Sequence, residues 1–149
     1  MSRQVIHSPI PPSHPVVDVA IGILIEGGEN GLRLLITQRP KQAILGGYWE
    51  LPGGKVEPGE TIAACLVREF AEEVGLTIEV SESLPVIEHR YDHGNVRLHP
   101  CFCRRVSGAP TNLQVAEHRW ATAAELSGYR FPPANAELMV TLARKMNAM

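Results

Sequence analysis

A cluster of glutamates is the feature of this chain whose residue types and spacing could do chemistry. Glu69, Glu72 and Glu73 stand at i, i+3 and i+4, so on a helix they share one face, and Glu60 precedes them. Like charges at this spacing repel by roughly a few tenths of a kcal/mol, and Arg68 relieves only part of this by pairing with Glu72. Converging hard oxygen ligands suit Mg²⁺ or Mn²⁺, which would turn the repulsion into coordination.

The loop before the glutamates favours the same chemistry. Gly53 and Gly54 let the backbone approach an ion or a ligand closely, and a glycine carbonyl beside carboxylates makes an all-oxygen site. Mg²⁺ held in this way keeps several waters and is completed by substrate phosphates. The pattern therefore predicts phosphoryl or nucleotidyl transfer to water.

The helix that must position the glutamates is predicted over Thr61–Val74. This segment has no Gly or Pro, Thr61 suits an N-cap, and Gly75 stands where a helix usually ends. An apolar stripe with a repeat of four residues would dock the helix on a sheet; it consists of Ile62, Leu66, Phe70 and Val74.

Apolar and β-branched runs predict the strands of that sheet. Val16–Ile25 and Leu32–Thr37 are expected to form a hairpin across the turn at Gly27–Gly31. Pro40–Tyr48 is expected to be a loop, and Pro52–Gly54 a tight turn. Further strands are predicted at Leu76–Val80, Leu84–His89, Val96–Arg105 and Glu117–Ala121, and helices at Thr122–Leu126 and Ala134–Met146. This order indicates a mixed α/β domain rather than βαβ repeats.

Bulk properties set the frame for this domain. The 149 residues fit a single domain over residues 16–149, after a Pro-rich tail expected to be flexible over residues 1–15. The net charge of -2 gives no reason to expect extended nucleic-acid binding. The three cysteines have no framework spacing, which indicates a reduced, cytoplasmic compartment, and no apolar run approaches a membrane span. Monomer and homodimer both remain open.

Residues Gly54–Leu76 resemble the Nudix box, in which G-x5-E-x7-R-E-U-x-E-E-x-G-U is the pattern and U is a bulky apolar residue. Phe70 at the first U is the only soft match. The positions that match are Gly54, Glu60, Arg68, Glu69, Phe70, Glu72, Glu73, Gly75 and Leu76.

This resemblance implies a Nudix-type α/β/α sandwich around a central mixed β-sheet, and a pyrophosphohydrolase of a nucleoside diphosphate linked to another group. It implies that Arg68 orients the glutamates. The metal ligands for Mg²⁺, with Mn²⁺ as a substitute, would be Glu69, Glu72 and Glu73, with help from the Gly53 carbonyl and Glu60. The general base stays open between Glu72, Glu73 and Glu117.

Segments outside the box are similar to the MutT branch, the oxidised-dGTP diphosphatases. These segments are Gln38–Pro40, Gly47–Lys55 and Phe131–Asn135. The branch implies cleavage of nucleoside triphosphates to monophosphate plus pyrophosphate, most simply on oxidised purine nucleotides such as 8-oxo-dGTP. The expected partner is thus a small nucleotide.

The same branch implies roles for residues outside the box. Arg39 would contact the nucleotide, and Asn135 would read the purine edge, because an amide offers one acceptor and two donors. Val19 and Leu51 would line the base pocket, and Tyr91 would stack on the base. Asn135 could instead simply cap or start the last helix.

Alternatives remain at the level of substrate and class. A tyrosine shortly after the box, as Tyr91 is, also recurs in dinucleoside-polyphosphate hydrolases. MutT-like bodies also occur in RNA 5′-pyrophosphohydrolases and cytidine-nucleotide pyrophosphatases. A non-catalytic Nudix-fold binding module would be expected to lose box carboxylates, and this box is intact.

His99, Cys101 and Cys103 alternate along one predicted strand, and Cys and His together are typical ligands of Zn²⁺. Three ligands on a straight strand spread over roughly 13 Å, too far to share one ion. Buried small cysteines are therefore the favoured interpretation.

Overall fold

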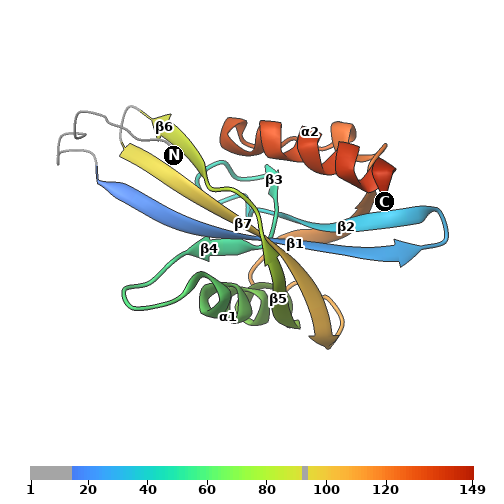
Figure 1. The fold of residues 1–149 in the computed structure, drawn as a ribbon, viewed down its shortest axis with the longest axis horizontal. Helices are drawn as coiled ribbons and strands as arrows, with labels where there is room; N and C mark the ends of the chain where they lie inside the picture. The colour runs from blue at the N-terminus through green and yellow to red at the C-terminus, as the bar shows by residue number, and fades with distance from the viewer. Residues whose placement is uncertain (1–14, 92–93) are drawn as a thin grey trace.

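The structure is a computed structural model that describes residues 15–91 and 94–149. The prediction of a flexible tail concerns residues 1–15, of which 1–14 lie outside the described part. Two helices cover opposite faces of a twisted sheet, so the molecule has three layers (Figure 1). The predicted α/β/α sandwich with a mixed sheet is confirmed.

The sheet begins with the predicted hairpin, which is longer than the sequence indicated. Strand β1 covers Val16–Gly28 and β2 covers Gly31–Gln38, so that Gly28 pairs with Gly31 across a two-residue turn. Gly31 has a φ of 101°, which glycine adopts without strain. The glycines that predicted the turn therefore lie partly within the strands.

Two short strands follow that the sequence did not predict. β3 (Trp49–Glu50) pairs with the end of β2, and β4 (Gly53–Lys55) pairs with β1, with Gly53 opposite Ile21. Pro52–Gly54 is thus not a free tight turn, because Gly53 and Gly54 are hydrogen-bonded into the sheet. The expected loop over 40–48 is confirmed.

The rest of the sheet lies beyond the first helix. The sheet runs in the order β3-β2-β1-β7-β5, and β4, β6 and β8 add to β1, β7 and β2 respectively. β1 and β7 are parallel, whereas the other pairs are antiparallel, which makes the sheet mixed. The later elements are β5 (Thr77–Ser83), β6 (Ile87–Tyr91), β7 (Gly94–Ser107), β8 (Glu117–Thr122), a 3₁₀ turn η1 (Leu126–Gly128) and α2 (Pro133–Ala148).

Strand alternation divides the core into two layers. On β2, Leu35 packs under α1 (Ile62–Val74), while Leu34 and Ile36 pack under α2. On β8, Trp120 belongs to the α1 layer and Ala121 to the α2 layer. This alternation therefore tells which face of the sheet each side chain of β2 and β8 occupies.

One element was predicted wrongly and several boundaries moved. The short helix expected at Thr122–Leu126 is instead the end of β8, a turn, and the 3₁₀ turn η1. Thr122 still pairs with Arg33 of β2, so sheet hydrogen bonds outweigh its place in a helical pattern. Within the part of the chain that the structure describes, no helix is both long and apolar enough to cross a membrane.

Candidate active site

Helix α1 has the limits that local sequence signals predicted. The Thr61 hydroxyl accepts a hydrogen bond from the Ala64 amide at 3.0 Å, which satisfies one free donor of the first turn. Gly75 ends the helix in the left-handed conformation, with a φ of 70°. The apolar stripe is buried as expected, through Leu66, Phe70 and Val74.

Helix α1 approaches the sheet closely because β1 carries a glycine beneath it. A Cβ on Gly22 would lie 2.2 Å from the Phe70 ring, so only glycine leaves room for that side chain. The Gly22 amide also donates to the Pro52 carbonyl at 2.8 Å. The same residue thus seats the helix and anchors the chain just before Gly53.

Gly53 and Gly54 lie directly against the helix glutamates. A Cβ on Gly54 would come within 2.5 Å of a Glu69 carboxylate oxygen. The Gly53 amide donates to the Glu73 carboxylate. A Cβ on Gly53 would lie 2.0 Å from the Ala20 carbonyl oxygen, so a larger residue there would clash with backbone, whereas one at Gly54 would displace the Glu69 carboxylate. The predicted juxtaposition of glycine loop and carboxylates is present.

Arg68 holds the glutamates of the box together. Its Nε lies 2.8 Å from Glu60, and its Nη1 lies 2.9 Å from Glu69 and 3.4 Å from Glu72. Hydrogen bonds from Arg68 and from the Glu57 amide lower the pKa of Glu60 to about 2. The partner carboxylates raise the pKa of Arg68. This is the orienting geometry that the family resemblance implied for Arg68.

Glu50 is a site residue that sequence reasoning missed. Successive side chains of β3 face opposite sides of the sheet, so Trp49 lies in the α2 layer and Glu50 lies on the α1 face. There the charge of Glu50 interacts with those of Glu69 and Glu73. Arg39 Nη1 binds the Glu50 carboxylate at 3.1 Å, and Arg39 Nε donates to the Ile44 carbonyl at 2.7 Å. The signal in the sequence was a lone charge between the apolar Trp49 and Leu51, next to the glycine loop.

The nearby positive and hydrogen-bonding groups only partly compensate the negative charge of the carboxylates on this face. Burial, a hydrogen bond to Glu69 and the charges of Glu69 and Glu50 raise the pKa of Glu73. Burial likewise raises the pKa of Glu50, although Arg39 opposes this. These surroundings favour the protonated form of Glu73, which is the form that a divalent cation would replace.

The donor set fits a hard divalent cation, since it consists of carboxylate oxygens beside a glycine backbone. Within residues 15–91 and 94–149, no three His, Cys, Asp or Glu side chains are already gathered around one ion position. Arg68 explains this, because it draws Glu60 and Glu72 toward its guanidinium. Glu69 and Glu73 are the pair that an ion would join first, and Glu72, which is 46% exposed, is the most free to turn.

The residues expected to hold the nucleoside gather on the other face. Val19 of β1, Leu51 and Tyr91 of β6 all pack into the α2 core layer, together with Ala134 at the start of α2. The Tyr91 ring lies 4.4 Å from the His89 ring, at an interplanar angle of 59°. The structure thus brings the predicted base-pocket residues to one layer.

Asn135 does not serve as the cap of α2. The N-cap residue is Pro132, with no side-chain hydrogen bond, and the Asn135 amide donates to the Pro132 carbonyl at 2.9 Å. The Asn135 side chain is half-buried in the first turn. A cavity of about 660 Å³ opens beside this turn, against Pro133 and Ala134. The capping alternative is therefore excluded in the described structure.

Glu117 lies at the start of β8 in a network of its own. Its carboxylate accepts from Asn112 Nδ2 at 3.2 Å and from the His118 amide at 3.1 Å, and it pairs with Arg119 at 2.9 Å. These hydrogen bonds lower the pKa of Glu117. A carboxylate so occupied is a weak proton acceptor, so the geometry favours a base among the helix glutamates.

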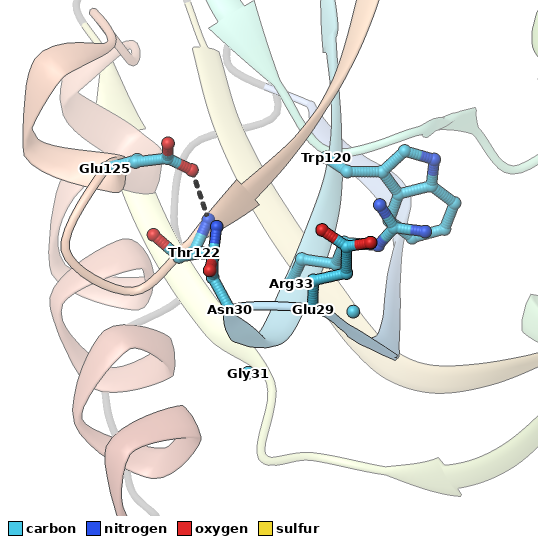
Figure 2. A pocket seen from close by; sticks show the side chains of 8 residues that line it. Glu29, Asn30, Gly31, Arg33, Trp120, Thr122 and Glu125 are labelled. Carbon is cyan, nitrogen blue, oxygen red and sulfur yellow. Dashed lines mark hydrogen bonds between the residues drawn. The ribbon is translucent and has the colours of Figure 1, made fainter.

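Two other features stand apart from the site. Cys101 and Cys103 are buried in the α1 core layer, as expected for structural cysteines. A cavity of about 500 Å³ lies at the β1–β2 hairpin, where Arg33 stacks on Trp120 at 5.0 Å (Figure 2). None of the predicted site residues lines that cavity.

Comparison with known proteins agrees with this geometry. The family model described as "NUDIX domain" matches residues 20–141. The chain is 31% identical over 128 residues to the 8-oxo-dGTP diphosphatase of Escherichia coli, covering 86% of this chain and 97% of that protein. It is 32% identical over 127 residues to the CTP pyrophosphohydrolase of the same organism, covering 83% and 89%.

A solved structure shows the same arrangement. In a structural study of MutT from Aliivibrio salmonicida and Vibrio cholerae, the matched chain superposes with a TM-score of 0.65 at 31% identity, covering 88% of this chain and 99% of that one. Fold and site together define a hydrolase of pyrophosphate bonds in nucleotides. This chain belongs to the Nudix family, whose members generally use divalent metal ions.

Proposed function

We propose that this Nudix hydrolase is a Mg²⁺-dependent, MutT-like pyrophosphohydrolase that cleaves nucleoside triphosphates to monophosphate and pyrophosphate. Oxidised purine nucleotides such as 8-oxo-dGTP are the proposed substrates. The observation that carries the proposal is Asn135. It stands on the first turn of α2, free of a capping role, and directly follows Ala134, which packs in the layer where Val19, Leu51 and Tyr91 gather.

The α1 face would supply the chemistry. Glu69, Glu72 and Glu73, with Glu60 and the Gly53 carbonyl, would hold Mg²⁺ or Mn²⁺, which when bound neutralises phosphate charge and acidifies water. Arg68 keeps Glu69 and Glu60 in place. With the cation bound, Glu73 would be held in its ionised form and would be placed to accept a proton from the attacking water.

Arg39 would act at the edge between the two faces. In the described structure its guanidinium binds Glu50 and the Ile44 carbonyl, which fixes its direction beside the carboxylates. A phosphate entering here would find a charge-assisted donor that is already oriented. Glu50 is thereby a positioning residue for Arg39.

The base would be read on the α2 face. The Asn135 amide offers one acceptor and two donors to a purine edge, and the apolar walls of Val19 and Leu51 exclude water from it. Tyr91 supplies a ring for stacking. Discrimination between bases would therefore rest on Asn135 rather than on the glutamates.

A cytidine nucleotide is the second candidate, because the relative named CTP pyrophosphohydrolase matches at nearly the same identity as the 8-oxo-dGTP diphosphatase. Dinucleoside polyphosphates and RNA 5′-triphosphate ends are further alternatives at the same catalytic face. The net charge of -2 favours a small nucleotide over RNA.

A hydrolysis panel tests the proposal. The enzyme with Mg²⁺, with Mn²⁺ and with EDTA is given 8-oxo-dGTP, dGTP, dCTP, CTP, diadenosine polyphosphate, ADP-ribose and 5′-triphosphate RNA. The highest kcat/KM on 8-oxo-dGTP, lost with EDTA, is expected. The highest value on CTP or dCTP would transfer the assignment to cytidine nucleotides. Activity that survives EDTA unchanged would contradict the metal dependence.

A further inference from the structure

A hydrogen-bonded relay at the start of β8 ends on His118, whose second ring nitrogen makes no hydrogen bond to the described residues. Glu117 accepts from Asn112 Nδ2 at 3.2 Å, and Asn112 Oδ1 lies 2.6 Å from His118 Nδ1. Hydrogen bonds to Nε2 are not found among residues 15–91 and 94–149. Asn112 therefore engages Nδ1 of His118, and Nε2 is available to a ligand.

The chemistry of the three groups fixes the tautomer of His118. An ionised carboxylate only accepts, so the Asn112 amide must turn its NH₂ to Glu117 and its oxygen to His118. An amide oxygen also only accepts, so His118 Nδ1 carries a proton. Nε2 then bears the lone pair, and protonation there gives an imidazolium backed by the negative charge of Glu117.

His118 lies on the catalytic face of the sheet. Trp120 belongs to the α1 layer, and a residue two positions away on the same strand faces the same side. In the sheet register His118 pairs with Thr37, which pairs in turn with Glu50. These three residues form one row, so His118 stands two strand spacings, roughly 10 Å, from Glu50.

The loop that carries Asn112 is fastened to the catalytic helix. The amides of Leu113 and Gln114 both donate to the carbonyl of Glu73 at 3.1 Å, and the Thr111 amide donates to the carbonyl of Val74 at 2.9 Å. The position of the relay is thus set by the end of α1. The Asn112 loop is therefore held against the helix that carries the glutamates.

We propose that His118 Nε2, as an imidazolium oriented by Asn112 and Glu117, binds the terminal phosphate of the nucleoside triphosphate. This role rests on the proposed function, because it requires a nucleoside triphosphate as substrate. The group that His118 would recognise is the third phosphate. His118 pairs with Thr37 near the end of β2, and Arg39, which binds Glu50, directly follows that end.

Distance separates this role from that of a base. A general base must lie within hydrogen-bond reach of the attacking water beside Glu69 and Glu73, whereas His118 is about 10 Å along the row from Glu50. A terminal phosphate extends away from the reacting bond and can reach this position. The other charged groups at this end are Glu50, Glu73, Glu117 and Arg119, and Arg119 is paired with Glu117.

The test compares His118→Ala with His118→Gln, since a glutamine amide can replace Nε2–H as a donor. Affinities for a non-hydrolysable imido analogue of dGTP and for dGDP are measured by calorimetry in Mg²⁺, alongside steady-state kinetics on the best triphosphate of the panel. His118→Ala is expected to raise Kd and KM for triphosphate about 10-fold, leave kcat within about 2-fold and leave Kd for dGDP unchanged. His118→Gln restores most of the affinity.

A second variant tests whether Asn112 orients the His118 ring. Asn112→Ala should weaken binding in the same direction. His99→Gln is the matched control, because His99 also lies on the α1 face but its Nε2 binds Asp18 at 2.8 Å.

The outcomes are distinguishable. Equal loss of affinity for dGTP analogue and dGDP, or unchanged affinity in His118→Ala, would overturn the role of His118 while leaving the proposed function standing. A fall in kcat with KM unchanged would make His118 a proton-transfer group and would also contradict the inference. A wild-type enzyme that neither binds nor hydrolyses nucleoside triphosphates would instead remove the proposed function, and this role with it.

Discussion

The two faces of the sheet differ in the side chains that they bury: one buries carboxylates and the other buries apolar groups. Under α1, Glu50, Glu69 and Glu73 crowd together, and burial raises the pKa of two of them. Under α2, the corresponding space is filled by apolar side chains, and Asn135 lies half-buried in the first turn of that helix. If the proposed site roles hold, reactivity and recognition would be built separately, with crowded carboxylates on one side and close apolar packing on the other.

The largest effect is expected where the α1 face loses a carboxylate. Glu73→Gln and Glu72→Gln should each lower kcat by about 10²–10⁴-fold, because both remove an oxygen ligand and a candidate base from the same helix face. Steady-state kinetics with Mg²⁺ and circular dichroism at 25 °C measure activity and fold. Activity near that of the wild type in both variants would show that the chemistry is not on this face.

A second effect tests the contact between loop and helix. Gly54→Ala places a Cβ 2.5 Å from the Glu69 carboxylate, so we expect kcat/KM to fall by about 10²-fold through displaced ligands. Gly27→Ala is the matched control, since a Cβ at that position meets nothing within 4 Å. Equal activity of the two variants would mean that Glu69 need not touch the loop.

The α2 face is tested through Asn135. Asn135→Ala should reduce the ratio of kcat/KM between 8-oxo-dGTP and dGTP by about 5–150-fold, which corresponds to the loss of one bidentate contact. The kcat on the poorer substrate should change little. Asn147→Ala, at the other end of α2, serves as control. An unaltered preference in Asn135→Ala would remove its role in base reading.

The smallest effect concerns stability. The folded-state pKa of Glu73 is raised above its unfolded value, so the protonated form is favoured in the fold, and stability falls as pH rises from about 4.5 toward the folded pKa. At pH 7.5 without metal, Glu73→Gln should therefore raise Tm by about 2–5 °C. At pH 4 the difference should vanish. A lower Tm of Glu73→Gln than of the wild type at pH 7.5 would show that repulsion among the carboxylates under α1 does not destabilise the fold.

The catalytic helix could be predicted from the sequence because its signals are local. The spacing of Glu69, Glu72 and Glu73, the Thr61 cap and the terminal Gly75 all act within one segment. The boundaries that moved, such as those of β1 and β5, depend on which partner strand continues the pairing. The helix expected at Thr122–Leu126 failed for the same reason, since Thr122 pairs with Arg33.

Pairing between distant segments produced the rest of the site. Glu50, Thr37 and His118 come from three strands and share a row only through the register of β3, β2 and β8. Gly22 matters because Phe70, far along the chain, needs its missing Cβ. The residue pattern of a single segment cannot predict these contacts between distant segments.

The sequence by itself determined the reaction class and predicted a ligand set, because one helix and the glycine loop before it carry the residues for both. Only the tertiary structure decided that Glu50 joins the carboxylates, that Asn135 is no cap, and that Asn112 fixes the tautomer of His118. The physical reason is that a side chain's charge state and free hydrogen-bonding groups depend on neighbours brought together by sheet pairing, which are distant in sequence.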